Sequence, residues 1–153
     1  MDIMELGAIG EMVGGTAVLV TLIYLAMQIR QNTASVRAST YQDFTRESAD
    51  TTRHMVFDGN LLEEFTPILQ GARGYDPGQD RRFALIAGLY ARNLQFGFLE
   101  LRAGRIERRQ FESYVSYHAE NFLRIPAWSQ WWKLNRKHFD EEFATWIDSL
   151  IDI

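Results

Sequence analysis

The chain has 153 residues, of which 46% are hydrophobic and 24% are charged, and this composition fits one folded domain rather than a disordered segment. It contains no cysteine, which excludes disulfides, thiolate metal sites and cysteine nucleophiles. The net charge of −4 disfavours nucleic acid as a partner, because phosphate binding needs a cationic surface.

The first predicted element is an apolar helix close to the N-terminus. Residues 12–27 carry no charge and would form roughly 24 Å of helix. Residues 6–29, which include Glu11 and Gln28, would cover roughly 36 Å and cross a hydrocarbon core of about 30 Å. A signal peptide is disfavoured by the acidic start MDIMEL and by the lack of a small-x-small cleavage site. A buried helix of a soluble protein is the alternative, but it would need a large surrounding core. We predict a transmembrane span over residues 1–29.

The charges on either side of this span predict its orientation. No Lys or Arg precedes the apolar run, whereas Arg30 and Arg37 follow it. Positively charged flanks stay on the cytoplasmic side of a membrane. We therefore expect a single-pass protein whose C-terminal body is cytoplasmic.

A stripe of small residues runs along the predicted span. Spacings of three, four, three and four place its members on one side of a helix: Gly7, Gly10, Gly14, Ala17 and Thr21. Such a stripe lets helix backbones approach closely in lipid, so we expect it to pack against another helix. The alternative is that glycine is simply common in transmembrane helices.

Glu11 lies beside this stripe, at a depth where a carboxylate facing lipid would be costly. Three interpretations are open. The carboxylate lies among the headgroups near the positive end of the helix dipole, it bonds to a partner helix, or it lines a pore in an oligomer.

The helix is predicted to continue beyond the span, because residues 28–57 contain neither Pro nor Gly. The sequence FDGN at 57–60 ends it. Few apolar residues lie between positions 30 and 53, chiefly Val36, Tyr41 and Phe44. We expect the juxtamembrane segment 30–57 to be either solvated or shared between subunits.

Residues 58–153 predict a small helical bundle that begins with two helices. A short helix covers about 61–69, and Asp76 followed by Pro77 marks the start of the next. Between positions 80 and 103 the apolar residues form two faces: Phe83, Ile86, Tyr90 and Leu94 on one, and Leu85, Leu89, Phe96 and Leu99 on the other. A helix apolar on two faces is expected at the centre of a bundle, and Gly104 ends it.

Three further helices are predicted in the rest of the chain. One covers about 107–123, one starts at Pro126, and the last is capped by Asp140. No hairpin signal interrupts them. The predicted fold is therefore all-α.

The residues that most often carry chemistry do not form a recognisable pattern. His54, His118 and His138 are not spaced from one another, or from a Glu, as metal ligands on one helix are. His118 lies on an apolar stripe, which favours a hydrogen-bonded core histidine. We therefore predict no catalytic residue, no metal site and no cofactor.

The densest cluster of aromatic and basic residues is PAWSQWWKLNRKHF at 126–139. Three indoles lie on one side and three cations on another: Trp128, Trp131 and Trp132, and Lys133, Arg136 and Lys137. Three interpretations are open. The indoles fill the core while the cations are solvated. Alternatively, the helix lies at a lipid interface, or the indoles line a ligand or partner pocket.

Four short motifs are spread along the chain: Gly10-Glu11, Tyr24-Leu25-Ala26, the stretch from Gln28 to Thr33 (QIRQNT), and Trp131-Trp132 followed by Arg136 and Phe139. In these motifs the chain resembles a widespread group of short bacterial proteins found in marine proteobacteria. The resemblance covers nearly the whole chain. It implies a bacterial inner-membrane protein with one span and a helical cytoplasmic domain, and it supplies no activity.

The leading hypothesis is a membrane-anchored, non-enzymatic accessory subunit that assembles with itself or with other membrane-protein subunits. The alternatives are an oligomeric cation pore with a ring of Glu11 carboxylates, and a ligand-binding or enzymatic domain around the Trp-rich helix. The lipid bilayer is an expected partner and nucleic acid is not.

Overall fold

The computed structural model describes residues 2–57 and 59–151, apart from the side chains at positions 5, 51, 54–57, 59, 62 and 121. In this part of the chain the structure is 84% helix, with six α-helices and no strand. The predicted all-α class is confirmed.

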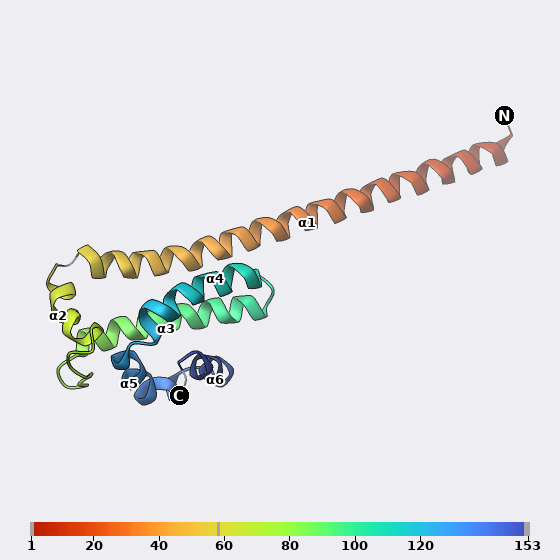
Figure 1. Ribbon diagram of the computed structural model, residues 1–153. Coiled ribbons are helices and arrows are strands. Elements are labelled where there is room, and N and C mark those ends of the chain that lie inside the picture. The colour runs from red at the N-terminus through yellow and green to blue at the C-terminus, as the bar shows by residue number, and fades with distance from the viewer. Residues whose placement is uncertain (1, 58, 152–153) are drawn as a thin grey trace. The chain divides into compact units, whose positions relative to one another are not determined.

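Most elements follow one another with short connections, and a longer loop over residues 70–80 joins α2 to α3 (Figure 1). In chain order they are α1 (Ile3–Phe57), α2 (Gly59–Leu69), α3 (Arg81–Arg102), α4 (Arg108–His118), the π-helical turn η1 (Ala119–Leu123), α5 (Pro126–Asn135), the 3₁₀ turn η2 (Arg136–His138) and α6 (Glu141–Leu150).

The chain divides into two compact units, residues 1–39 and 40–153. The first consists of the N-terminal part of α1. The second contains the last turns of α1 together with α2 to α6. The sequence analysis grouped residues 30–57 as one segment, whereas the structure assigns residues 40–57 to the bundle.

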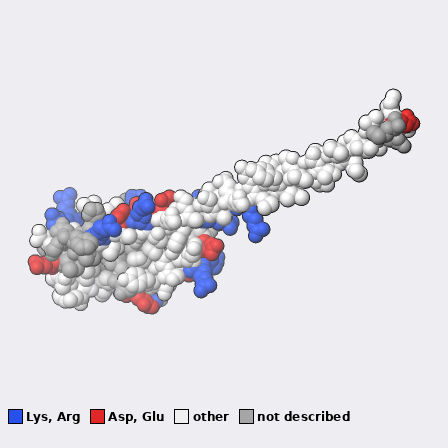
Figure 2. Space-filling view, turned by 90° about the horizontal axis from the view of Figure 1, so that it is seen from above, with Lys and Arg blue, Asp and Glu red and all other residues white. Residues whose placement is uncertain are grey.

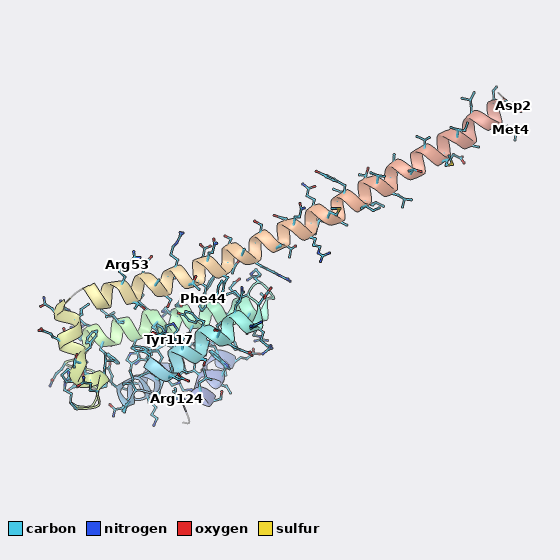
Figure 3. The ribbon with its side chains drawn as sticks, turned by 45° about the horizontal axis from the view of Figure 1, so that its top comes forward. Asp2, Met4, Phe44, Arg53, Tyr117 and Arg124 are labelled. Atoms are coloured by element: carbon cyan, nitrogen blue, oxygen red, sulfur yellow. The ribbon has the colours of Figure 1, made fainter. Side chains whose placement is uncertain are left out.

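Residues 40–57 belong to the bundle because one side of this helix is buried. Phe44 is 0% exposed, and its ring centroid lies 4.5 Å from that of Tyr114 and 6.0 Å from that of Phe111. Figure 3 shows Phe44 on the side of α1 that faces the rest of the bundle. Ser48, one turn further on, is 4% exposed. The expectation that residues 30–53 are poorly buried within one chain is therefore wrong for Phe44 and Ser48.

Three predicted helix boundaries are confirmed by their capping geometry. Gly104 follows α3 with a φ of 70°, and the Arg105 N–H bonds back to the Glu100 carbonyl at 2.9 Å. Pro126 is the first residue of α5. Asp140 caps α6, because its Oδ1 accepts from the N–H groups of residues 142 and 143 at 3.0 Å.

The start of α3 differs from the prediction. The helix begins at Arg81, not at Asp76-Pro77. The Asp76 side chain accepts a hydrogen bond from the Gly78 N–H at 2.7 Å, and its carbonyl accepts from the Asp80 N–H at 2.8 Å. These bonds close a turn of their own before the helix, since Asp side chains bond readily to the backbone two residues on.

The helix predicted over 107–123 contains an irregular turn. α4 ends at His118, and residues 119–123 form a single π-helical turn. The Arg124 N–H reaches the Ala119 carbonyl at 3.3 Å, a spacing of five residues. This turn holds one residue more than an α-helical turn would.

One aromatic-rich core holds the second unit together. Its largest fully buried side chains come from every helix of this unit, and they include Phe44, Phe65, Phe83, Leu94, Phe111, Leu123, Trp128, Trp132, Phe143 and Ile147. The inner face of α3 lies at its centre, with Phe83, Tyr90 and Leu94 all buried. A face this apolar supplies the main driving force for folding.

Candidate functional site

The N-terminal part of α1 is the most exposed apolar segment of the chain. One helix, within Leu6–Asp50, is long and apolar enough to cross a membrane, and none of its most apolar 18-residue window is buried. Leu19, Val20 and Ile23 are each 61% exposed. Figure 2 shows one side of this segment as an almost uncharged surface. An apolar surface of this length needs a non-aqueous environment or a partner.

The predicted small-residue stripe is open within the single chain. The helix is continuous through Gly7, Gly10 and Gly14, so their spacing keeps them on one side, together with Ala17 and Thr21. Apart from the helix's own backbone, no atom of the described chain lies within 4 Å of the place where these three glycines would carry a β-carbon.

The hydroxyl groups in this segment bond within the helix. Thr16 Oγ1 donates to the Met12 carbonyl at 2.8 Å, and Thr21 Oγ1 donates to the Ala17 carbonyl at 2.9 Å. Such bonds hide hydroxyl groups from an apolar environment. The side chain of Glu11 is exposed, and it remains the one acidic group between residues 6 and 29.

The Trp-rich helix α5 contributes to the core. Trp128 and Trp132 are 0% exposed, and Trp131 is 3% exposed. Two of these rings stack, since the planes of Trp128 and Trp132 differ by 8° with centroids 6.4 Å apart. Indoles buried this way cannot reach lipid headgroups, so the interfacial interpretation is wrong for them, and the core interpretation accounts for all three.

The cations of this helix differ in their surroundings. Lys133 and Lys137 are exposed, whereas Arg136 is half-buried and pairs with Asp148 at 3.0 Å. Asp148 also accepts a hydrogen bond from the Trp132 indole N–H at 2.7 Å. The carboxylate thus joins α5 to α6, and its charge raises the pKa of Arg136. The roles predicted for Lys133 and Lys137 stay predictions.

A polar network that the sequence analysis missed joins α1, α3 and α4. The Tyr114 hydroxyl bonds to Ser48 Oγ and lies 3.2 Å from Asn93 Oδ1. The Asn93 amide donates to the carbonyl of Phe44 at 3.2 Å. Ser48 and Asn93 are both buried. No sequence spacing links these residues, because they come from three separate helices.

His118 stands at the edge of this network among aromatic rings. Its ring centroid lies 4.2 Å from that of Tyr114 and 5.1 Å from that of Tyr90. Burial lowers the pKa of His118 to about 4. Its surroundings agree with the prediction of a core histidine. His54 lies outside the described side chains, and no group of three or more possible metal ligands occurs among the described residues.

Two buried polar atoms of the core have no hydrogen-bond partner in the described part of the chain. They are the Tyr90 hydroxyl and the Trp128 indole N–H. Their rings meet edge to face, with centroids 5.8 Å apart. Burial raises the pKa of Tyr90 far above its ordinary value. Neither residue lines any of the four grooves described for this bundle, so we assign no ligand to these atoms.

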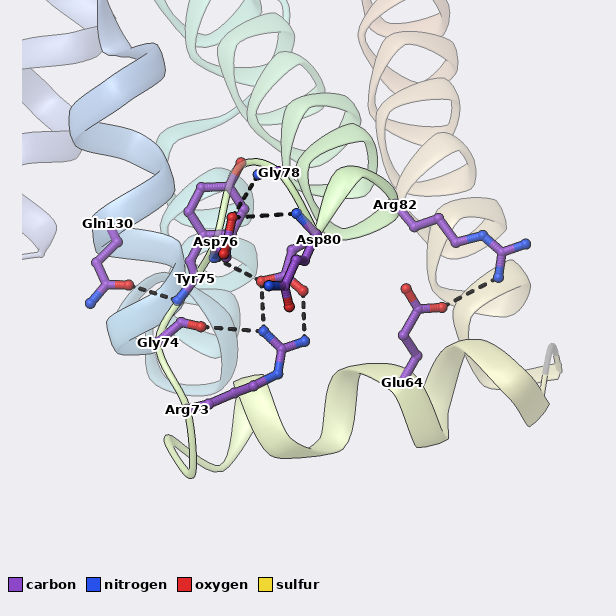
Figure 4. Close-up of polar contacts among 10 residues, drawn as sticks. Glu64, Arg73, Gly74, Tyr75, Asp76, Gly78, Asp80, Arg82 and Gln130 are labelled. Atoms are coloured by element: carbon purple, nitrogen blue, oxygen red, sulfur yellow. Dashed lines mark hydrogen bonds and ion pairs between the residues drawn. The ribbon is translucent and has the colours of Figure 1, made fainter.

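A buried carboxylate organises the loop before α3 (Figure 4). Asp80 accepts two hydrogen bonds from Arg73, at 2.6 and 2.7 Å, and one from the Asp76 N–H at 2.8 Å. The guanidinium lowers the pKa of Asp80. Nearby, the Tyr75 N–H donates to the Gln130 side chain at 2.8 Å, which attaches the loop to α5. This cluster has a structural role.

A groove of about 670 Å³ lies between α3, α4 and α6. Its floor is apolar and includes Phe111 and Val115. Arginines line its rim, but Arg102 pairs with Glu142, and Arg108 lies 3.4 Å from Glu112. Arg124 also lines the groove. No buried polar side chain is among the described residues that line it, so we assign no ligand to it.

The second predicted apolar face of α3 is exposed in the single chain. Leu85 is 70% exposed, Leu89 57%, Leu99 40% and Phe96 39%. The expectation that both faces of this helix are buried inside the bundle is therefore wrong. We call these four residues the outer stripe of α3.

Comparisons with protein-family models, with curated proteins and with solved structures find no match to this chain.

Proposed function

We propose that this chain is a membrane-anchored, non-enzymatic subunit that assembles with itself or with other membrane proteins. In this proposal residues 1–29 cross a bacterial inner membrane once and the bundle lies in the cytoplasm. The observation that carries it is the apolar N-terminal segment of α1, whose most apolar window has no buried part.

Two further features support an anchor. The threonine hydroxyls of this segment bond to backbone carbonyls, as an apolar environment requires. Arg30 and Arg37 follow the segment, and no basic residue precedes it, so the positive-inside rule favours a cytoplasmic bundle.

Assembly is the role that best suits the exposed surfaces. The small-residue stripe and the outer stripe of α3 are both open in the single chain. Apolar surface of this extent on a folded protein marks an interaction site.

Membrane extraction tests the anchor. The wild-type chain, expressed in bacteria, should stay with the membrane fraction after alkaline carbonate washing and should float with lipid in a density gradient. The double variant Val18→Asp/Leu22→Asp should be released, because each charge costs about 3 kcal/mol at the centre of a span.

A matched control places the same two charges elsewhere on the same helix. Ser35→Asp/Ser39→Asp has the same spacing but lies beyond residue 29, on exposed positions. It should remain in the membrane fraction. Release of the wild-type chain by carbonate, or equal behaviour of the two double variants, would contradict the proposed anchor.

Thiol labelling tests the orientation, and the absence of native cysteine keeps the background clean. A membrane-impermeant maleimide added to spheroplasts should label Asp2→Cys directly. It should label Leu134→Cys, which is 54% exposed on α5, only after the membrane is opened. The reverse pattern would place the bundle outside.

A further inference from the structure

The outer stripe of α3 is an apolar ridge with one exposed charged residue, Arg92, between Leu89 and Phe96. Its members are separated by four, seven and three residues, which keeps them on one side of the helix, opposite the buried residues Tyr90 and Leu94. On average, slightly more than half of the surface of these four side chains is exposed. Natural helices of soluble bundles usually direct charged residues outward at such positions.

A groove lies on each side of the N-terminal half of this ridge, and Leu89 lines both. One groove, of about 480 Å³, separates α3 from α1. The other, of about 770 Å³, separates α3 from α5 and η2. The ridge with its two grooves therefore forms one corrugated surface, into which a second ridge could fit.

The two sides of this surface carry opposite charge. The α1 side is lined by Asp43, Arg46, Glu47 and Asp50 and has a net negative charge. The other side is lined by Arg81 and Arg92, and no acidic residue is among the residues that line it. The Arg92 guanidinium lies 5.7 Å from the centre of the Phe139 ring, which draws it away from the ridge.

We propose that a second copy of this chain covers the outer stripe, with the α3 helices of the two copies packed in parallel. This inference rests on the proposed assembly function and names its partner and surface. A two-fold axis along α3 places ridge against ridge. It also sets the acidic side of each copy opposite the basic side of the other.

The opposite alignment is disfavoured by the same charges. A two-fold axis perpendicular to α3, in the plane of the interface, makes the helices antiparallel and brings the acidic side of one copy onto the acidic side of the other. Like charges placed together across an interface oppose binding. An anionic lipid surface is disfavoured for the same reason, because it would meet Asp43 and Asp50.

The size of the surface suits a small dimer interface. The 22 residues of α3 extend over roughly 33 Å, whereas the 10 residues of α5 extend over roughly 15 Å. Packed helices have axes about 8–10 Å apart, so the face that α1, α3 and α5 present has an area of roughly 450 Å². This is about half of the about 800 Å² that each partner buries in a typical stable complex.

Cysteine cross-linking in the full chain tests the proposal. Each stripe residue is replaced singly by cysteine, and the protein is oxidised mildly in its membrane. Parallel packing predicts that Leu85→Cys and Leu99→Cys each cross-link with themselves. A mixture of the two should give no mixed dimer, because these positions lie roughly 21 Å apart along the helix and a disulfide spans only about 4.4–6.8 Å between Cα atoms.

Tyr117→Cys is the control, since this tyrosine is 65% exposed and lies on α4, which is not part of the proposed face. It should cross-link far less than the stripe positions. Cross-linking of the mixture but not of the single variants would mean antiparallel packing and would overturn the proposal. Equal cross-linking at Tyr117 and at the stripe would overturn it too.

Native mass spectrometry of the full chain provides a second measurement. Wild-type protein should show twice the 17.7 kDa mass of one chain, and Leu85→Glu/Leu89→Glu should be monomeric with an unchanged near-UV spectrum. Tyr117→Glu, on the exposed side of α4, should remain dimeric. A dimer that survives the double substitution overturns this inference while leaving assembly through α1 intact. If the wild-type chain does not associate with membranes but is still a dimer, the proposed anchor is contradicted and the proposed dimer is not.

Discussion

Gly97 marks the closest approach between α3 and its neighbours. A β-carbon at this position would lie 2.5 Å from Phe44 Cε2 and 2.8 Å from Phe111 Cε2. Both rings are buried, so they cannot move aside without disturbing the core. We expect Gly97→Ala to lower the free energy of unfolding by about 1–3 kcal/mol, as measured by urea denaturation.

Gly88 supplies the control on the same helix. A β-carbon there meets only Trp131 Cζ2, at 3.7 Å, which is an ordinary contact. Gly88→Ala should therefore be neutral or stabilise the protein by up to about 1 kcal/mol, because alanine favours helix. A similar loss of stability in both variants would show that crowding at Gly97 is not the cause.

His118 predicts a pH dependence of stability. Its pKa of about 4 in the folded protein lies below the ordinary value of 6.5. Between these values the unfolded chain binds a proton that the folded chain does not. The free energy of unfolding should therefore have its full value above about pH 6.5, and it should fall by roughly 1–3 kcal/mol as the pH decreases toward 4. Asp80 and Glu100 have pKa values lowered by arginine partners from ordinary values of 3.8 and 4.5, so they lose their contribution to stability mainly below pH 4.5.

Urea titrations between pH 4.5 and 7 measure this effect. His118→Phe keeps an aromatic ring and should flatten the dependence in that range. His138→Gln removes an exposed histidine of η2 and serves as the control. If the slope is lost in the control and kept in His118→Phe, the assignment to His118 is wrong.

At the scale of the helices, local signals predicted boundaries better than they predicted burial. Gly104, Pro126 and Asp140 act through their own backbone geometry, so they could be recognised without knowledge of the fold. The start of α3 was misplaced because Asp76 bonds within a turn that resembles a helix start.

Burial depends on neighbours that a periodic pattern does not identify. The pattern showed that α3 has two apolar faces, but not that the bundle covers only one of them. Phe44 was assigned to a poorly buried segment because its partners, Phe111 and Tyr114, lie more than sixty residues away. The bonds among Ser48, Asn93 and Tyr114 were missed for the same reason.

The N-terminal cap of α6 gives a prediction for one element. Asp140 bonds to two otherwise unpaired N–H groups at the start of the helix. Asp140→Ala should lower the free energy of unfolding by about 1 kcal/mol. Asp140→Ser should lower it much less, because a serine hydroxyl can also cap the helix. Thermal unfolding of the two variants measures the difference. Equal loss in both would mean that the cap bonds add little.

At the scale of the molecule, the core lies entirely within the second unit. Every buried hydrophobic residue among the described positions falls between Phe44 and Ile151. A fragment of residues 40–153 should therefore be helical, cooperative in unfolding, and within a few degrees of the full chain in melting temperature. Circular dichroism of both proteins in the same detergent provides the comparison. A fragment without a near-UV signal would show that residues 1–39 are needed for packing.

The π-helical turn at Ala119–Leu123 is a place where this chain can change in length. It closes with one residue more than an α-helical turn, so deleting one residue there would leave an α-helical turn and keep the following residues close to their present register. Deleting one residue inside a regular helix such as α3 would instead rotate the residues that follow by about 100° and take buried side chains out of the core. In homologous chains a lone one-residue gap should therefore fall between positions 119 and 123 and not within α3.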